Sequence, residues 1–284
     1  MSRRDLQLRE YNTLIEQLVL KLKKGEGELR FNRPFLIASD VAAQYFCEKK
    51  VEMQYLHGEI ETEQKTLGTE AHEKLLEGSV ETRREALWKE IYGKKPVFVL
   101  EMPIVAKYKD LILAGRPDVA IFLQGFPMFI FEYKFSNSRR PFRDHHVQVR
   151  TYGLILRNMG FDTSQLFYAI IMAEPKAKDD KELTERVIEA VVENGPKEAV
   201  LAIESATVYV NKFDSTQAER DLDWAVDFWM KKREAIPTEN PNKCKSCEYS
   251  SECMNLLYQQ GGLGASQVFD RRPLKYNFLT SKYY

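Results

Sequence analysis

Charged side chains interrupt the apolar, strand-like runs in the middle of the chain. Asp118 lies in the sequence GRPD, and Glu132 and Lys134 lie in FEYK. Residues two apart in a strand share a face, so Glu132 and Lys134 should point the same way while Tyr133 points to the other side. Burying a carboxylate and an ammonium group is costly unless the two are paired or bind a metal ion.

Two carboxylates from neighbouring strands would supply the oxygen ligands that Mg²⁺ and Mn²⁺ prefer. Such an ion polarises a phosphate and lowers the pKa of a bound water. Lys134 could orient that water or stabilise charge on the phosphate. Asp118, Glu132 and Lys134 therefore indicate metal-dependent phosphodiester chemistry. The alternative, from these residues alone, is a buried Glu–Lys pair that only stabilises the strand.

Other polar residues could join this group. His72 lies upstream in GTEAHEKLLEG, and Gln148 and Tyr152 lie four apart in HHVQVRTYGLIL, on one helix face. The amide and the phenol could steady the lysine or contact a nucleic-acid backbone. Glu101 is a further carboxylate expected to point from a strand toward the same region. Each also has an ordinary reading as a surface, core or half-buried helix residue.

Three arginines follow the third strand-like run. Arg139, Arg140 and Arg143 occur within SNSRRPFRDHH, where they could contact the phosphates of a nucleic acid. A solvated loop would have the same composition, so both readings stay open.

The four cysteines form a separate pattern. Cys47 stands alone, whereas Cys244, Cys247 and Cys253 are close together in NKCKSCEYSSEC. In a reducing compartment, such cysteines are more often metal ligands than disulfides. Four thiolates can bind Zn²⁺ or hold an iron–sulfur cluster, and the spacing does not separate the two. Either would join the two ends of the domain.

Hydrophobic periodicity predicts the elements that position these residues. One helix should start at Ser39-Asp40 and end at Gly58, with Cys47 inside it. The first three strands should form an antiparallel meander, with Asp118 inside the second. The predicted helices cover 5–23, 39–58, 61–78, 80–91, 141–159, 180–204 and 215–234; the predicted strands cover 97–109, 111–123, 128–136, 165–173 and 206–213. This order predicts an α/β fold with a mixed central β-sheet flanked by helices.

Composition limits the functional classes. The chain has 284 residues, and Lys+Arg and Asp+Glu each number 42, so the net charge is zero and any polyanion contact must come from a local basic patch. No apolar run is long enough to span a membrane, and we find no signal-type segment. The chain lacks a G-x-x-x-x-G-K-S/T loop, which argues against a motor of that type. We expect a cytoplasmic protein that is not bound to a membrane.

The ordered motifs GTEAHEKLL, GRPDVAIF, FEYKFS and QVRTY resemble the RecB-type branch of the PD-(D/E)xK nuclease superfamily. This resemblance implies a restriction-endonuclease-like core. It also implies that His72, Asp118, Glu132 and the backbone carbonyl of Tyr133 bind the metal. Lys134 would then be the catalytic lysine, and Gln148 and Tyr152 would match the helix motif of that branch.

One cysteine before these motifs and three after them is similar to the iron–sulfur RecB-like nucleases. These include AddB-type subunits and stand-alone CRISPR-associated RecB-like exonucleases. The resemblance implies a 4Fe–4S cluster on Cys47, Cys244, Cys247 and Cys253, joining the N- and C-terminal parts. It implies a nuclease domain over 35–255, with a helical extension over 1–34 and a tail over 256–284.

The function implied by this resemblance is a Mg²⁺- or Mn²⁺-dependent DNA exonuclease. It would act on single-stranded or splayed DNA ends during CRISPR spacer acquisition, beside the adaptation integrase complex. One alternative is a stand-alone repair or recombination nuclease of host or virus. Another is a catalytically silent iron–sulfur subunit that binds DNA. The oligomeric state stays open.

Overall fold

The computed structural model describes residues 2–25, 27–58, 79–180 and 182–253. His72, the helix expected over 61–78 and the tail over 256–284 lie outside these residues. Among the helices described, none is both long and apolar enough to cross a membrane.

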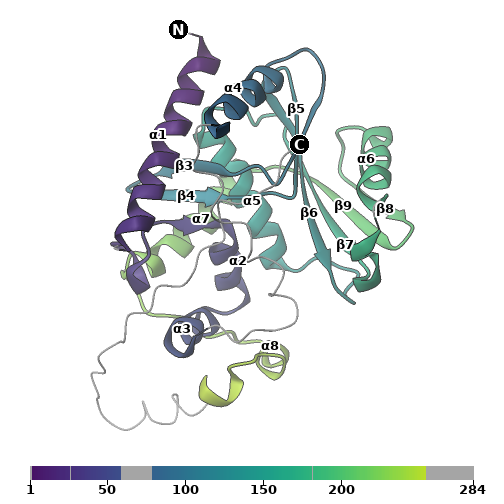
Figure 1. The fold of residues 1–284 in the computed structure, drawn as a ribbon. Helices are drawn as coiled ribbons and strands as arrows, with labels where there is room; N and C mark the ends of the chain where they lie inside the picture. Colours follow the sequence, from purple (N-terminus) through teal and green to yellow (C-terminus); the bar gives the residue numbers. More distant parts are fainter. Residues whose placement is uncertain (1, 26, 59–78, 181, 254–284) are drawn as a thin grey trace.

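A six-stranded sheet forms the centre of the fold (Figure 1). Only β6 and β7 run parallel, and every other neighbouring pair is antiparallel, so the sheet is mixed as predicted. Helix α5 (Arg143–Asn158) makes the crossover that a parallel pair requires. In spatial order the strands are β2 (Val97–Leu100), β5 (Val119–Leu123), β6 (Phe126–Phe135), β7 (Phe167–Ala173), β9 (Ala206–Lys212) and β8 (Ala199–Ile203).

Strand β6 divides its side chains between two hydrophobic cores. Phe129 and Phe131 face a core shared with helix α6 (Leu183–Asn194), and Tyr133 packs against the same core. Ile130 faces the larger core shared with α5. The alternation therefore directs Glu132 toward α5 and Tyr133 away from it, as the sequence predicts.

The predicted three-stranded meander is wrong, because each of its first two runs is broken into two strands. A second sheet contains β1 (Leu36–Ile37), β4 (Leu111–Gly115) and β3 (Ile104–Tyr108), while β2 and β5 belong to the large sheet. Proline lies in both breaks, at Pro103 and Pro117, where it cannot donate a ladder hydrogen bond. The N–H of Glu101 donates to the carbonyl of Asp118 at 2.9 Å, which joins the two breaks side by side.

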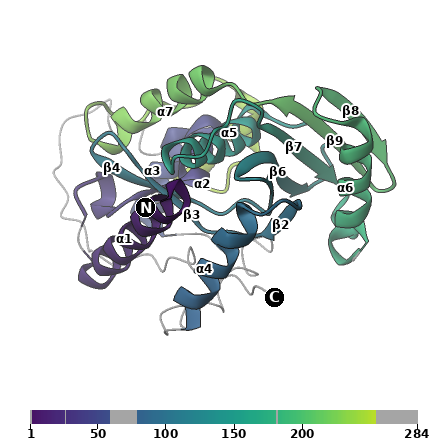
Figure 2. The same cartoon turned by 90° about the horizontal axis from the view of Figure 1, so that it is seen from above.

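Several helices pack around α5 on one face of the large sheet, opposite the face that α6 covers. Helix α1 (Arg3–Lys24) begins at a capping box made by Ser2 and Asp5 and ends at Gly25, whose φ of 64° suits glycine. Figure 2 shows α2, α5 and α7 gathered together, with α1 and α4 beside them. The remaining helices are η1 (Arg30–Asn32), α2 (Ala38–Phe46), α3 (Glu48–His57), α4 (Ser79–Ile91), η3 (Pro175–Asp179), α7 (Ser215–Trp229) and α8 (Pro241–Lys245).

Two predicted helices need correction. The helix expected over 39–58 is two helices, because Cys47 between them has extended backbone angles (φ −170°, ψ 121°). The helix expected over 180–204 ends at Asn194, after which Gly195 has a φ of 73° and the chain continues into β8. The structure thus gives the sheet an edge strand that the sequence analysis did not predict.

Candidate active site

Asp118 and Glu132 are brought together by the register of β5 and β6. Val119 pairs with Phe131, so the residues one step beyond, Asp118 and Glu132, lie opposite one another. Asp118 is not inside a strand as predicted; it lies in the break between β4 and β5. There its Oδ2 atom accepts a hydrogen bond of 2.7 Å from the backbone N–H of Tyr133.

Glu132, Lys134 and Gln148 form a closed hydrogen-bonded triangle. The Nζ atom of Lys134 donates to Oε1 of Glu132 and to Oε1 of Gln148, each at 2.8 Å. The Nε2 atom of Gln148 donates to the same Glu132 oxygen and to the hydroxyl of Tyr152, each at 2.8 Å. The structure therefore brings together five of the residues singled out in the sequence, with Asp118 beside the triangle.

The electrostatics of this group reflect burial and mutual charge. Burial raises the pKa of Asp118 well above its ordinary value, and the charge of Glu132 raises it further. Burial alone would lower the pKa of Lys134, but the charge of Glu132 and its hydrogen bond, together with the charges of Asp118 and Asp144, outweigh burial, so the net pKa shift is upward. Lys134 is therefore held as a cation. Glu101, an exposed residue in a bend, adds a smaller upward contribution to the pKa of Asp118.

The second carboxylate oxygen of Glu132 is suited to bind a metal ion. Its Oε2 atom is buried and has no hydrogen-bond partner among the described residues, which is costly for a carboxylate. With Asp118 alongside, two carboxylates and nearby backbone oxygens offer the donor set of a hard divalent cation. The described residues contain no group of three or more His, Cys, Asp or Glu that could hold a metal; His72 lies outside them.

The sequence analysis missed a glycine that makes room for this site. A Cβ atom on Gly115, the last residue of β4, would lie 2.7 Å from Cδ1 and 2.8 Å from Cε1 of Tyr152. Only glycine leaves space for that ring, which in turn contacts Gln148. Two further residues near the site, Asp144 and His145, lie at the start of α5 and were not singled out in the sequence. The charge of Asp144 contributes to the raised pKa of Lys134. The pKa of His145 is lowered mainly by burial and, to a smaller extent, by the charge of Lys134.

The three arginines do not act as one group. The side chain of Arg139 is 81% exposed and lies 3.5 Å from Glu174, and its backbone carbonyl accepts a hydrogen bond from the hydroxyl of Tyr209. Arg140 is also exposed. Arg143 lies over the ring of Tyr45, with 4.7 Å from its guanidinium carbon to the ring centroid.

The four cysteines come into one region from opposite ends of the described chain. All four are free thiols. Burial raises the pKa of Cys253, and the charges of Cys47, Cys247 and Cys244 raise it further. The N–H of Thr238 donates to the sulfur of Cys47 at 3.4 Å. The four thiols therefore lie close enough for their charges to interact, but they do not form a metal-ligating group among the described residues.

A buried ion pair holds this region together. Glu48, the residue after Cys47, has no exposed surface and accepts two hydrogen bonds from Arg233, at 2.6 and 2.7 Å. It also accepts one from Gln44 and one from the N–H of Ile236, each at 2.8 Å. The pair therefore joins the first cysteine to the segment that leads to the other three.

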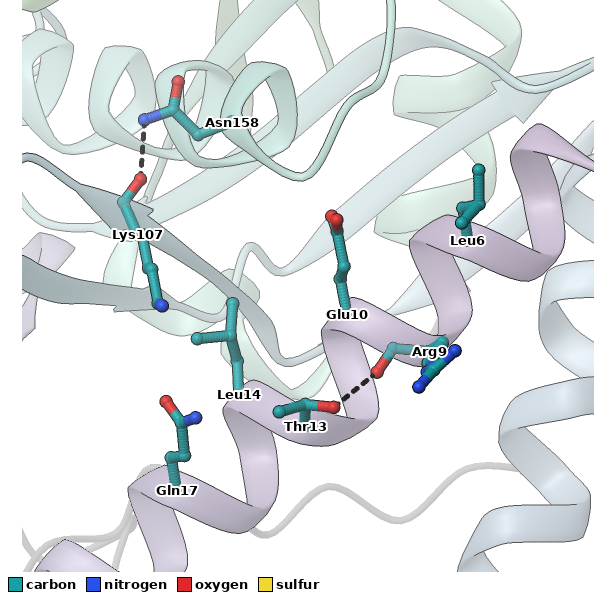
Figure 3. A pocket seen from close by; sticks show the side chains of 8 residues that line it. All are labelled: Leu6, Arg9, Glu10, Thr13, Leu14, Gln17, Lys107 and Asn158. Carbon is teal, nitrogen blue, oxygen red and sulfur yellow. Dashed lines mark hydrogen bonds between the residues drawn. The ribbon is translucent and has the colours of Figure 1, made fainter.

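A hollow of about 430 Å³ elsewhere in the fold contains none of the predicted site residues. Figure 3 shows that most of its lining side chains come from α1, with Lys107 and Asn158 opposite. Asn158 donates to the carbonyl of Lys107 at 2.9 Å, and Thr13 donates to the carbonyl of Arg9 at 3.0 Å. These bonds stabilise the fold and give no indication of a ligand.

Comparison with known proteins found similarities to a curated sequence, a solved structure and a family model. A segment of 45 residues is 38% identical to the mitochondrial exonuclease V of Candida dubliniensis, and covers 16% of this chain but only 7% of that protein. A crystal structure of SSO0001 is similar with a TM-score of 0.37 and 13% identity, over 76% of this chain and 84% of that one. The family model of the PD-(D/E)XK nuclease superfamily matches residues 13–254. This match extends over most of the chain, which therefore belongs to the PD-(D/E)XK nuclease superfamily.

Proposed function

We propose that this protein is a divalent-metal-dependent deoxyribonuclease whose active site contains Asp118, Glu132, Lys134, Gln148 and Tyr152. The observation that carries the proposal is the environment of Glu132. Lys134 and Gln148 donate to one of its carboxylate oxygens, and the other is buried without a partner among the residues that the structure describes. Asp118, Glu132 and the carbonyl of Tyr133 would hold the ion, and His72 is proposed as a further ligand.

Each side chain has a separate task in this proposal. When bound, Mg²⁺ or Mn²⁺ supplies Lewis-acid polarisation of the phosphate and a water of lowered pKa. Lys134 keeps a positive charge where negative charge develops on the scissile phosphate. Gln148 fixes the rotamers of Lys134 and Glu132 together, since its amide bonds to both. Tyr152 fixes the orientation of the Gln148 amide.

The test compares cleavage of labelled single- and double-stranded DNA by the wild type and by Asp118→Ala and Lys134→Ala variants, with Mg²⁺ or Mn²⁺. We expect both variants to lose activity by roughly 100-fold or more while remaining folded. Arg157→Ala is the matched control, because Arg157 forms a half-exposed ion pair with Glu219 on the surface. Undiminished cleavage by either site variant would show that the site assignment is wrong.

We also propose that the enzyme is an exonuclease on single-stranded or splayed DNA ends. The name of the Candida relative supports the exonuclease reading. The proposed role in CRISPR spacer acquisition, beside the adaptation integrase complex, rests on the resemblance of the cysteine layout to CRISPR-associated RecB-like exonucleases and on the lack of a G-x-x-x-x-G-K-S/T loop in the sequence. Circular single-stranded DNA, which has no ends, should resist cleavage that degrades the linear form. Equal degradation of both would make the protein an endonuclease.

The alternative is a stand-alone repair or recombination nuclease of host or virus. The genes adjacent to this one discriminate between the two settings, because adaptation genes beside it would indicate spacer acquisition. A third reading is a silent iron–sulfur subunit that binds DNA. It predicts binding of the same oligonucleotides with no cleavage by the wild type under any metal condition.

The four cysteines are proposed to hold a 4Fe–4S cluster that links the two ends of the domain. The support is the donor chemistry, the approach of the four thiols to one another and the resemblance of their layout to iron–sulfur nucleases. We expect purified protein to absorb visible light and to contain iron and sulfide. Cys244→Ala should lower the melting temperature and weaken DNA binding. A colourless protein with one equivalent of zinc would exclude the cluster.

A further inference from the structure

A cleft lined by aromatic rings and arginines lies between α2, α7 and residues 236–238. Its volume is about 500 Å³, which is in the range of pockets that bind small organic groups. Tyr45 on α2 and Trp224 on α7 form one wall, with their ring centroids 4.8 Å apart. Ile236, which is 48% exposed, lines the cleft as well. The contacts α2·α5 and α5·α7 place this cleft beside the helix that carries Gln148.

Arginines extend the aromatic wall at both ends. The guanidinium carbon of Arg143 lies 4.7 Å from the centroid of Tyr45, and that of Arg233 lies 4.4 Å from the centroid of Trp224. The Arg143 side chain is nevertheless 70% exposed. One face of its guanidinium group therefore covers Tyr45, and the other remains accessible to a second planar group.

The cleft also carries a local excess of accessible positive charge. Arg143 and the exposed Arg220 both line it. The one carboxylate in its lining, Asp221, is only 3% exposed; it pairs with Arg150 and also lies 3.9 Å from Arg143, so one buried negative charge faces three arginines. The chain as a whole has no net charge, so this cleft is a place where an anionic strand would be attracted.

Helix α5 carries one residue of the cleft, Arg143, and two residues of the active site, Gln148 and Tyr152. Arg143 is the first residue of that helix and lies five positions before Gln148, which corresponds to about 7.5 Å along the helix axis. The loop that enters α5 comes from the end of β6, which carries Lys134. The cleft therefore lies near the segment that joins β6, with Glu132 and Lys134, to α5.

We propose that this cleft is a base-stacking subsite for single-stranded nucleic acid. A base would stack on the accessible face of Arg143 and against the edge of Trp224, while Arg220 contacts the adjacent phosphate. Duplex DNA would not fit, because its bases are already stacked within the helix. The proposal rests on the proposed nuclease function only for the identity of the strand, and binding can be measured without cleavage.

Tryptophan fluorescence gives a local readout. Of the three tryptophans in the chain, Trp88 and Trp229 are 1% and 0% exposed, whereas Trp224 is 36% exposed. Oligothymidylate added in EDTA to the full-length protein should therefore quench Trp224, and Trp224→Phe should abolish the quenching. A blunt duplex of the same length should leave the fluorescence unchanged.

Affinity measurements on Arg143 separate stacking from simple charge attraction. Arg143→Ala should weaken oligothymidylate binding by roughly 5- to 150-fold, the equivalent of about 1–3 kcal/mol for one stacked base. Arg143→Lys should recover little of this loss, because lysine keeps the charge but lacks the planar group. Arg157→Ala on the same helix is the control and should bind like the wild type.

Three outcomes would overturn the subsite: absence of quenching, quenching that persists in Trp224→Phe, or full recovery of affinity in Arg143→Lys. Quenching and Arg143-dependent affinity in a protein that never cleaves would support the subsite and refute the proposed enzyme. Metal-dependent cleavage with a KM unaffected by Arg143→Ala would support the proposed enzyme and refute the subsite. The two proposals therefore fail in different experiments.

Discussion

Gly115→Ala tests whether the fold supports the active site through Tyr152. The new Cβ atom would lie 2.7 Å from the Tyr152 ring, about 0.7 Å inside the 3.4 Å at which ordinary contacts begin. Gly115 does not have a positive φ, so alanine meets no backbone strain, and the cost comes from this contact and a lesser one with Cδ1 of Ile155 at 3.3 Å. Tyr152 is 3% exposed and cannot move freely. Overpacking of this kind costs about 1–3 kcal/mol.

Gly115→Ala should reduce the cleavage rate as well as the stability of the fold. Because the hydroxyl of Tyr152 bonds to Gln148, a displaced ring misorients the amide that fixes Lys134 and Glu132. We expect cleavage to fall roughly 10- to 100-fold, with a decrease in melting temperature of about 2–4 °C per kcal/mol.

The control is a double-mutant cycle with Tyr152→Leu, which removes the ring. Gly115→Ala should cost much less stability in that background. If the two substitutions instead prove additive in stability, or if Gly115→Ala leaves cleavage at the wild-type rate, then Tyr152 does not transmit the contact and the reasoning is refuted.

Three further predictions concern charge. Burial and, to a lesser extent, the charge of Arg150 lower the pKa of His146 to about 4. Between pH 6.5 and 4, His146 is therefore protonated in the unfolded chain but neutral in the native protein. The free energy of unfolding should fall as the pH drops through this window. His146→Gln should flatten that dependence in urea titrations. Glu48→Gln should cost about 3–5 kcal/mol, because it leaves Arg233 without its buried partner, whereas Glu219→Gln in a half-exposed pair should cost under about 1 kcal/mol. Asp118→Asn should raise the melting temperature of the metal-free protein yet abolish any increase caused by Mn²⁺; a wild-type increase that the variant retains would place the metal elsewhere.

The alternation on β6 was readable from the sequence because it depends only on strand geometry. Glu132 and Lys134 alternate along the strand with the aromatic residues Phe131, Tyr133 and Phe135. In the structure these aromatic residues pack on one face of the sheet, so Glu132 and Lys134 lie on the other, as the pattern predicts. The breaks at Pro103 and Pro117 were also encoded locally, since proline cannot continue a ladder. They were missed because the apolar runs on either side of each proline are long enough to be taken for one strand.

Other features depended on contacts between distant parts of the chain. Strand β8 is a short, apolar edge strand, AVLAI, whose Val200 is 64% exposed. Five apolar residues without alternation do not distinguish a strand from the continuation of the helix before them. The role of Gly115 depends on a ring 37 positions away in α5. The Tyr45–Trp224 wall depends on the approach of α2 to α7, which no short motif records.

The same charges that make the site useful should make the metal-free protein less stable. At neutral pH, Glu132 is balanced by Lys134, but Asp118 has no cation of its own within hydrogen-bond distance among the described residues and accepts only the Tyr133 N–H. The raised pKa of Asp118 reflects this cost, because the native protein favours the neutral carboxyl group. The contribution of Asp118 to the free energy of unfolding is therefore present at low pH and is lost as the pH rises through the folded-state pKa. A bound divalent cation would remove that cost and stabilise the native state by mass action. Cleavage and metal-induced stabilisation should therefore depend on the same carboxylate, with the stability deficit of the metal-free protein as its measurable counterpart.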